Sequence, residues 1–239
     1  MSFELHPNRE RGHLDHGWLK TAHSFSFAHY VNEKRMNFGT LLVLNEDTIQ
    51  AGAGFGEHYH DNMEIVTIPL SGSLRHGDSM GNSSIIQTGE VQIMSAGTGL
   101  MHSEHNASTT EPVHLLQIWI VPNTRGLPTR YAQLNVKDQL TRNAFHEVVS
   151  PIPSPKTLLI HQNAWFSLGN FEAGRPFHAS LHDQTYGAFL FVIKGKIQMH
   201  GQTIETGDAI ALQDELVIDG TVIEPSSLLL IEVPMNFSN

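Results

Sequence analysis

The sequence predicts an all-β protein in which two similar β-barrels follow one another along the chain, with few and short helices. Three observations lead to this prediction. Short runs rich in Val, Ile, Leu and Phe recur along the 239 residues, turn-forming residues separate them, and a stretch of the first half is repeated in the second. Short strands separated in this way are typical of an antiparallel sandwich or barrel.

The expected strands of the first half are alternating or continuous apolar runs, as half-buried or fully buried strands are. Before them, Trp18, Phe25, Phe27 and Tyr30 form an aromatic set that we expect to pack in the core. The segment HGDSMGNSS at 76–84 contains residues that tolerate tight turns, and we expect it to connect a hairpin. The expected strands are 39–47, 63–70, 83–89, 91–97 and 113–121.

A proline-rich stretch separates the two halves. VVSPIPSPK, at 148–156, has three prolines within five residues and interrupts any strand or helix. We therefore expect an N-terminal domain of residues 1–150 and a C-terminal domain of residues 151–239. The expected strands of the second domain are 188–195, 196–204 and 228–235.

Two short segments of the first half reappear in the second. SGSL at 71–74 is similar to KGKI at 194–197, and QTGEVQIM at 87–94 is similar to ETGDAIAL at 205–212. An internal duplication explains both matches, whereas the alternative is a coincidence of turn residues. The duplication predicts two domains of one fold.

Composition and charge argue against several classes of function. The chain has 24 acidic and 14 basic residues, and a net charge of −10 opposes attraction to nucleic acid or anionic membranes. No apolar run approaches the roughly 20 residues of a membrane-spanning helix. We expect neither direct nucleic-acid binding nor a membrane location, and the polar N-terminus favours the cytoplasm.

Two pairs of candidate metal ligands lie in the first half. His58 and His60 are two residues apart, a spacing that places both side chains on one face of a strand, about 7 Å apart. His102 and Glu104 repeat this spacing. One pair alone is better explained by histidines that face solvent, but two pairs favour a metal site. With no cysteine, the donors are nitrogen and oxygen, which suit iron, manganese, nickel, copper or zinc.

The residues around these pairs resemble the two motifs of the cupin superfamily and, more closely, the pirin family. The first motif reads G-x5-H-x-H-x3-E from Gly52 to Glu64, and the second has Ser95 where a proline is usual. The resemblance runs from about residue 9 to the C-terminus and is densest in the first half. The segments that carry it include ERGHLDHGWLKTAHSFSFAHY at 10–30, AGAGFGEHYHDNMEIVT at 51–67, DSMGN at 78–82 and IMSAGTGLMHSEHN at 93–106.

The resemblance implies two cupin barrels in tandem and decides a point that the spacing leaves open. The fourth ligand of a typical cupin would be Glu64, whereas in pirins it is the glutamate here numbered Glu104. Glu64 would then either orient the ligating imidazoles from outside or serve as a strand carboxylate that hydrogen-bonds locally. The implied metal ligands are His58, His60, His102 and Glu104, with iron as the first candidate.

The repeat predicts that the second barrel holds no metal. When Gly89 is aligned with Gly207, Gly220 and Val222 take the places of His102 and Glu104. Neither residue offers a side-chain donor to a metal ion.

The resemblance also implies an activity. Bacterial pirins are described as quercetin 2,3-dioxygenases, which implies ring opening of quercetin or a related flavonol by dioxygen with release of carbon monoxide. Glu104 would accept the proton of the substrate hydroxyl. The alternative is a metal-dependent regulator that binds a protein partner without turnover. The sequence has no G-x-S-x-G motif and no phosphate-binding glycine loop, so the hydrolase, kinase and dehydrogenase classes lack support.

Overall fold

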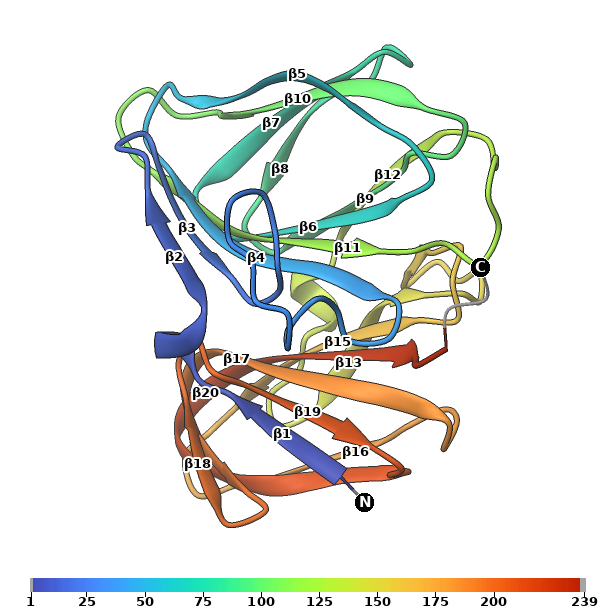
Figure 1. Cartoon of the computed structure of the whole chain (residues 1–239). Coiled ribbons are helices and arrows are strands. Elements are labelled where there is room, and N and C mark those ends of the chain that lie inside the picture. The colour runs from blue at the N-terminus through green and yellow to red at the C-terminus, as the bar shows by residue number, and fades with distance from the viewer. Residues whose placement is uncertain (1, 237–239) are drawn as a thin grey trace.

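The computed structural model describes residues 2–236, which form three β-sheets stacked in layers (Figure 1). The all-β prediction is confirmed, and the two helices are single 3-10 turns, Asn8–Glu10 and Lys137–Gln139. No helix within residues 2–236 is long and apolar enough to cross a membrane.

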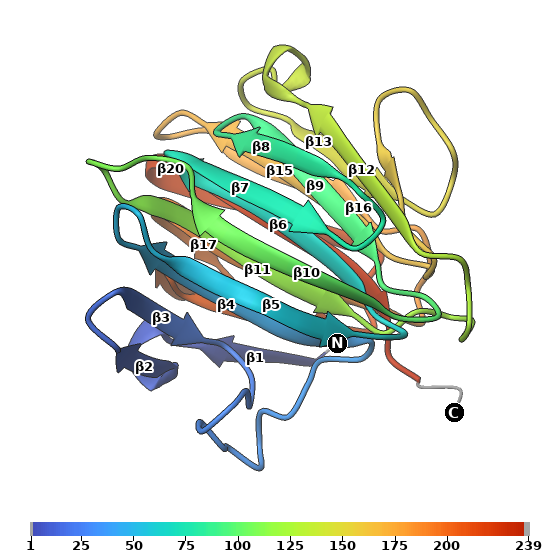
Figure 2. The ribbon, with the colours of Figure 1, turned by 90° about the horizontal axis from the view of Figure 1, so that it is seen from above.

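The first barrel consists of two sheets. Its strands are β2 (Gly12–Asp15), β3 (Leu19–His23), β4 (Leu41–Ile49), β5 (Gly54–His60), β6 (Glu64–Ser71), β7 (Ser73–Asp78), β8 (Ser83–Gln87), β9 (Glu90–Ser95), β10 (Leu100–Asn106), β11 (Val113–Ile120) and β12 (Arg130–Asn135). The order is β5-β10-β7-β8 in one sheet and β12-β9-β6-β11-β4-β3-β2 in the other. Seen from above, the four-stranded sheet lies over the seven-stranded one (Figure 2). The predicted hairpin at 76–84 is confirmed, because β7 pairs with β8.

The second barrel is built from a single nine-stranded sheet that curls on itself. Its strands are β1 (Ser2–His6), β13 (Phe145–Ser150), β14 (Leu158–Leu159), β15 (Trp165–Phe171), β16 (Pro176–Ser180), β17 (Tyr186–Met199), β18 (Gln202–Glu205), β19 (Ala209–Gln213) and β20 (Val217–Pro234). The strands expected at 188–195 and 196–204 are wrong as separate elements. They form β17, which continues through Gly195 (φ 99°), then a turn and β18.

Two strands join the second barrel from outside the expected C-terminal range. β1 pairs with β19, and the backbone N–H of Asn8 donates to Asp208 at 2.7 Å. β13, which ends at residue 150, pairs with β15. The division at residue 150 stays a prediction, while the sheet pairing assigns residues 2–6 and 145–150 to the second barrel.

The largest apolar core lies between the barrels. On β4, β6 and β11, alternate residues point either into the first barrel or toward the second, so both faces of the sheet are buried. This double burial explains why these strands are nearly continuous apolar runs in the sequence. The core side chains include Leu44, Val66, Ile68, Leu116 and Ile118 from the first barrel and Phe166, Phe189, Phe191, Leu229 and Ile231 from the second.

Candidate metal centre

Neighbouring strands of the four-stranded sheet bring the candidate ligands together. β5 and β10 are antiparallel, with His58 opposite His102 and His60 opposite Leu100. The register shifts between His102 and Glu104, where a bulge interrupts the pairing. Bulges of this kind commonly redirect a side chain beside a functional site.

Three histidines converge on one point. The ligating atoms of His58, His60 and His102 all lie within 4.8 Å of one another. The ring centroids are 4.2 Å apart for His58 and His102, 4.8 Å for His58 and His60, and 4.9 Å for His60 and His102. The structure therefore brings these three predicted residues together.

Burial keeps the imidazoles of His60 and His102 neutral. His102 is 2% exposed, and neither of its ring nitrogens has a hydrogen-bond partner within residues 2–236. Burial and the neighbouring imidazoles lower the pKa of His102 to about 2 and that of His60 to about 4. His58 donates a hydrogen bond from Nδ1 to the carbonyl oxygen of Gly56 at 2.8 Å. The lone pair that can bind a metal ion is therefore on Nε2. Neutral imidazoles with directed lone pairs are what a transition metal ion requires.

Glu104 follows His102 by two residues on β10 and is buried. Gln117 donates from Nε2 to Glu104 Oε2 at 2.6 Å, and burial raises the pKa of the Glu104 carboxyl despite this donation. The ligating atoms of Glu104, His102 and His76 all lie within 4.8 Å of one another. Glu104 is not part of the group formed by His58, His60 and His102.

The sequence analysis missed His76. This residue lies on β7 directly opposite Glu104, is 1% exposed, and pairs through Nε2 with Asp78 at 3.0 Å. The available signal was the H-x-D spacing of His76 and Asp78 on one expected strand face. By contrast, His105 is exposed on the outer face of β10, as its alternation with Glu104 predicts.

Glu64 is directed away from these residues. It accepts hydrogen bonds from Ser95 Oγ at 3.0 Å and from the backbone N–H of His161 at 3.2 Å. The His161 ring lies 3.3 Å from its other oxygen. Glu64 thus bonds to the loop between β14 and β15 of the second barrel, rather than to the metal ligands.

A cavity of about 600 Å³ opens beside the three histidines. Aromatic side chains frame it: the ring centroids of Trp18 and Phe55 are 5.2 Å apart, as are those of Phe27 and Trp119. The expectation that Trp18 and Phe27 pack in the core is wrong, whereas Phe25 does lie in the core between the barrels. The cavity lining includes His58, His60, Glu104, Gln117, Asn45 and Asp47.

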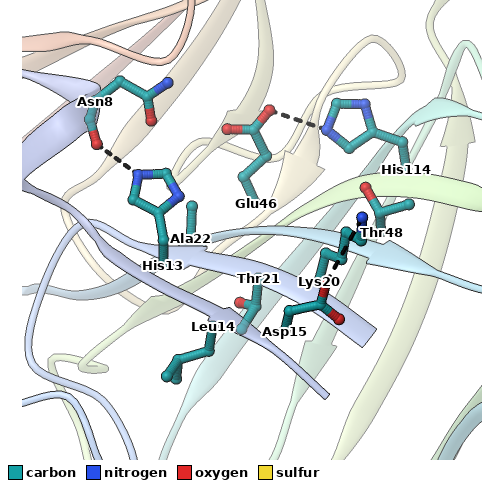
Figure 3. A pocket seen from close by; sticks show the side chains of 10 residues that line it. All are labelled: Asn8, His13, Leu14, Asp15, Lys20, Thr21, Ala22, Glu46, Thr48 and His114. Carbon is teal, nitrogen blue, oxygen red and sulfur yellow. Dashed lines mark hydrogen bonds and ion pairs between the residues drawn. The ribbon is translucent and has the colours of Figure 1, made fainter. Parts of the chain in front are cut away.

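A second hollow, of about 420 Å³, lies over β2, β3 and β4 but offers few unpaired groups (Figure 3). His13 bonds to the carbonyl oxygen of Asn8 at 2.7 Å, and His114 bonds to Glu46 at 2.9 Å. Lys20 lies 3.6 Å from Asp15. Because these polar groups are already paired with one another, the aromatic cavity is the better candidate site.

The second barrel has apolar residues at the positions of the centre. Gly220 pairs with Phe177 as His102 pairs with His58, and a Cβ atom at Gly220 would collide with the Phe177 ring. Val222, Leu190 and Leu230 are buried around it in an apolar cluster. The interior that is polar in the first barrel is therefore filled with hydrocarbon in the second.

Two β-barrels in one chain, with groups of histidine and glutamate side chains of metal-ligand spacing inside the first, define a two-domain cupin. Comparison with protein families identifies the family: residues 4–120 match the Pirin model, and residues 147–233 match the model of the quercetinase C-terminal cupin domain. This chain belongs to the pirin family.

Its relatives agree over nearly the whole length. The chain is 39% identical to quercetin 2,3-dioxygenase of Escherichia coli K12, over 96% of this chain and 98% of that protein. It is 38% identical to a putative quercetin 2,3-dioxygenase of Mycobacterium tuberculosis, over 96% and 94%. The crystal structure of E. coli YhhW superposes with a TM-score of 0.93 at 37% identity, over all of both chains. The nickel(II) complex of this bacterial pirin gives 0.91 at 38% identity, over 98% and 99%.

Proposed function

We propose that this protein is a metal-dependent dioxygenase that opens the ring of quercetin or a related flavonol. The observation that carries the proposal is the convergence of His58, His60 and His102 on one point, beside an aromatic-lined cavity whose wall includes His58 and His60. The relatives named quercetin 2,3-dioxygenase support it.

We propose His58, His60, His102 and Glu104 as the ligands of one divalent ion. Within residues 2–236, neither ring nitrogen of His102 has a hydrogen-bond partner, and burial keeps this imidazole neutral. Both properties fit a metal ligand. The nickel(II) complex of the E. coli pirin supports a divalent metal. We propose iron as the native metal, although this donor set also suits manganese, nickel, copper and zinc.

When bound, the ion would supply Lewis acidity toward the flavonol hydroxyl and redox chemistry toward dioxygen. Glu104 accepts the proton of the hydroxyl next to the flavonol carbonyl, because its carboxylate lines the cavity together with His58 and His60. Gln117 fixes the orientation of that carboxylate through its hydrogen bond. The aromatic frame, with Trp18 and Phe27, holds the flat ring system and excludes water.

The overall reaction balances with one flavonol and one dioxygen. Both oxygen atoms enter the organic product, one ring carbon leaves as carbon monoxide, and the carbon–carbon bonds on either side of that carbon break. The proton held on Glu104 returns to the carboxylate of the product.

Oxygen consumption tests the proposal. Protein loaded with iron is expected to consume dioxygen and bleach the near-visible absorbance of quercetin, with saturation in quercetin. His58→Ala should abolish both signals, whereas His105→Ala, on the outer face of β10, should retain them. A rate equal to that of the same concentration of iron in buffer would contradict the proposal.

A further inference from the structure

The inner face of β4 carries two polar residues where a barrel strand would ordinarily be apolar. Asn45 and Asp47 are both 3% exposed and both line the aromatic cavity. Their neighbours on the same face of the strand, Val43 and Ile49, are buried apolar residues. Neither polar residue belongs to the proposed metal ligands.

Both side chains retain an unused acceptor. Asn45 Oδ1 and Asp47 Oδ1 have no hydrogen-bond partner among the residues that the structure describes. Next to them on β3, Thr21 lies opposite Asp47 and His23 lies opposite Asn45, and both of these side chains also line the cavity. Buried polar groups are nearly always hydrogen-bonded, so unpaired acceptors at a cavity wall indicate that a bound molecule supplies the donors.

These acceptors continue the line of polar groups that begins at Glu104. Gln117, which donates to Glu104, lies on β11 directly opposite Asn45. Asp47 follows two residues along β4 on the same face. A flat molecule with one end at Glu104 would therefore extend along β4 over Asn45 and Asp47.

We propose that Asn45 and Asp47 form a hydroxyl-binding subsite of this cavity, which recognises the part of an aromatic ligand that does not contact the metal. The inference rests on the proposed function and names its substrate class: flat aromatic compounds with hydroxyl groups at both ends. An amide oxygen and a carboxylate oxygen both accept from O–H groups. A ligand without hydroxyl groups at the far end leaves the two acceptors unpaired, and sites of this kind reject such ligands strongly.

The experiment compares two flavonols that share the metal-binding end. Quercetin carries hydroxyl groups on both ring systems, whereas 3-hydroxyflavone has only the hydroxyl next to the carbonyl. Each is titrated under argon into zinc-loaded protein, so that no turnover occurs, and binding is followed by quenching of the fluorescence of Trp18 and Trp119, which line the cavity. The variants are Asn45→Ala and Asp47→Ala, with Asp47→Asn as the variant of nearly unchanged shape. Thr48→Ala, on the other face of β4, is the matched control.

The parent protein and Thr48→Ala are expected to bind quercetin about tenfold or more tightly than 3-hydroxyflavone, as one or two good hydrogen bonds provide. Asn45→Ala and Asp47→Ala should each lose most of this preference through weaker quercetin binding, while the affinity for 3-hydroxyflavone stays the same. Equal affinities in the parent, or a preference retained by both alanine variants, would overturn the subsite and leave the proposed function standing. If neither flavonol binds, both the subsite and the proposed function are overturned.

Discussion

Replacement of Asp47 by asparagine is expected to stabilise the metal-free protein above pH 6 and to leave its stability unchanged below pH 4. Burial raises the pKa of Asp47 to about 6 from its ordinary value of 3.8, and the negative charge of Glu104 adds to the rise, while the nearby Thr21 hydroxyl opposes it. The folded protein therefore binds this proton more tightly than the unfolded chain does. Stability contributed by the protonated form is lost as the pH rises from about 4 to about 6.

The size of the effect follows from the shift. A difference of about 2 pKa units corresponds to about 3 kcal/mol, at about 1.4 kcal/mol for each unit. Asparagine has nearly the same shape and carries no charge, so the variant should exceed the parent in free energy of unfolding by up to about 3 kcal/mol at pH 7.5.

Urea denaturation measured at intervals from pH 4 to pH 8 on the metal-free parent and Asp47→Asn tests this reasoning. The difference between their free energies of unfolding should be near zero at pH 4, grow as the pH rises to about 6, and reach up to about 3 kcal/mol at higher pH. Thr48→Ala, on the outer face of the same strand, should show no such growth. A constant difference across pH, or an asparagine variant less stable than the parent at pH 7.5, would refute the account of Asp47.

Three further substitutions test other parts of the structure. Burial opposes ionisation of Glu46, but hydrogen bonds and charge from His114 and Arg11 lower its pKa from 4.5 to about 2. The ionised Glu46 should therefore stabilise the protein by at most about 3 kcal/mol above pH 4.5, and this contribution should disappear toward pH 2. Glu46→Gln should abolish this part of the acid denaturation profile measured by circular dichroism. Phe177→Ala should leave a cavity in the second barrel and lower the free energy of unfolding in urea by about 3 to 5 kcal/mol without changing metal content. Gly54→Ala should separate β5 from β10, since its Cβ would collide with the backbone at Glu104, and metal content measured by elemental analysis should fall.

The local features of this protein were readable from the sequence because they depend on neighbouring residues. Alternating apolar runs predicted the strands, and the two-residue spacing of His58 and His60 predicted that both lie on one strand face. The structure adds that His58 lies directly opposite His102, a register that β5 and β10 acquire only by pairing.

The long-range features left no local pattern to read. β1 crosses to the second barrel because it completes the edge beside β19, about 200 residues away, and no periodicity encodes that partner. Glu64 likewise bonds to His161, 97 residues farther on, so its role as a contact to a loop of the second barrel could not be predicted. One signal was present but unused: Asn45 and Asp47 interrupt the apolar alternation in the middle of a buried strand, which is the mark of a polar cavity wall.

The metal content of two matched variants tests the central claim most directly. Glu104 lines the cavity beside His102, whereas Glu64 bonds to Ser95 and His161. After saturation with metal and dialysis, the parent and Glu64→Gln should each retain a single ion per chain by elemental analysis. Glu104→Gln should retain far less, because the amide lacks the anionic charge of the carboxylate. A fully loaded Glu104→Gln together with an empty Glu64→Gln would contradict the proposed ligand set and assign the fourth position to Glu64.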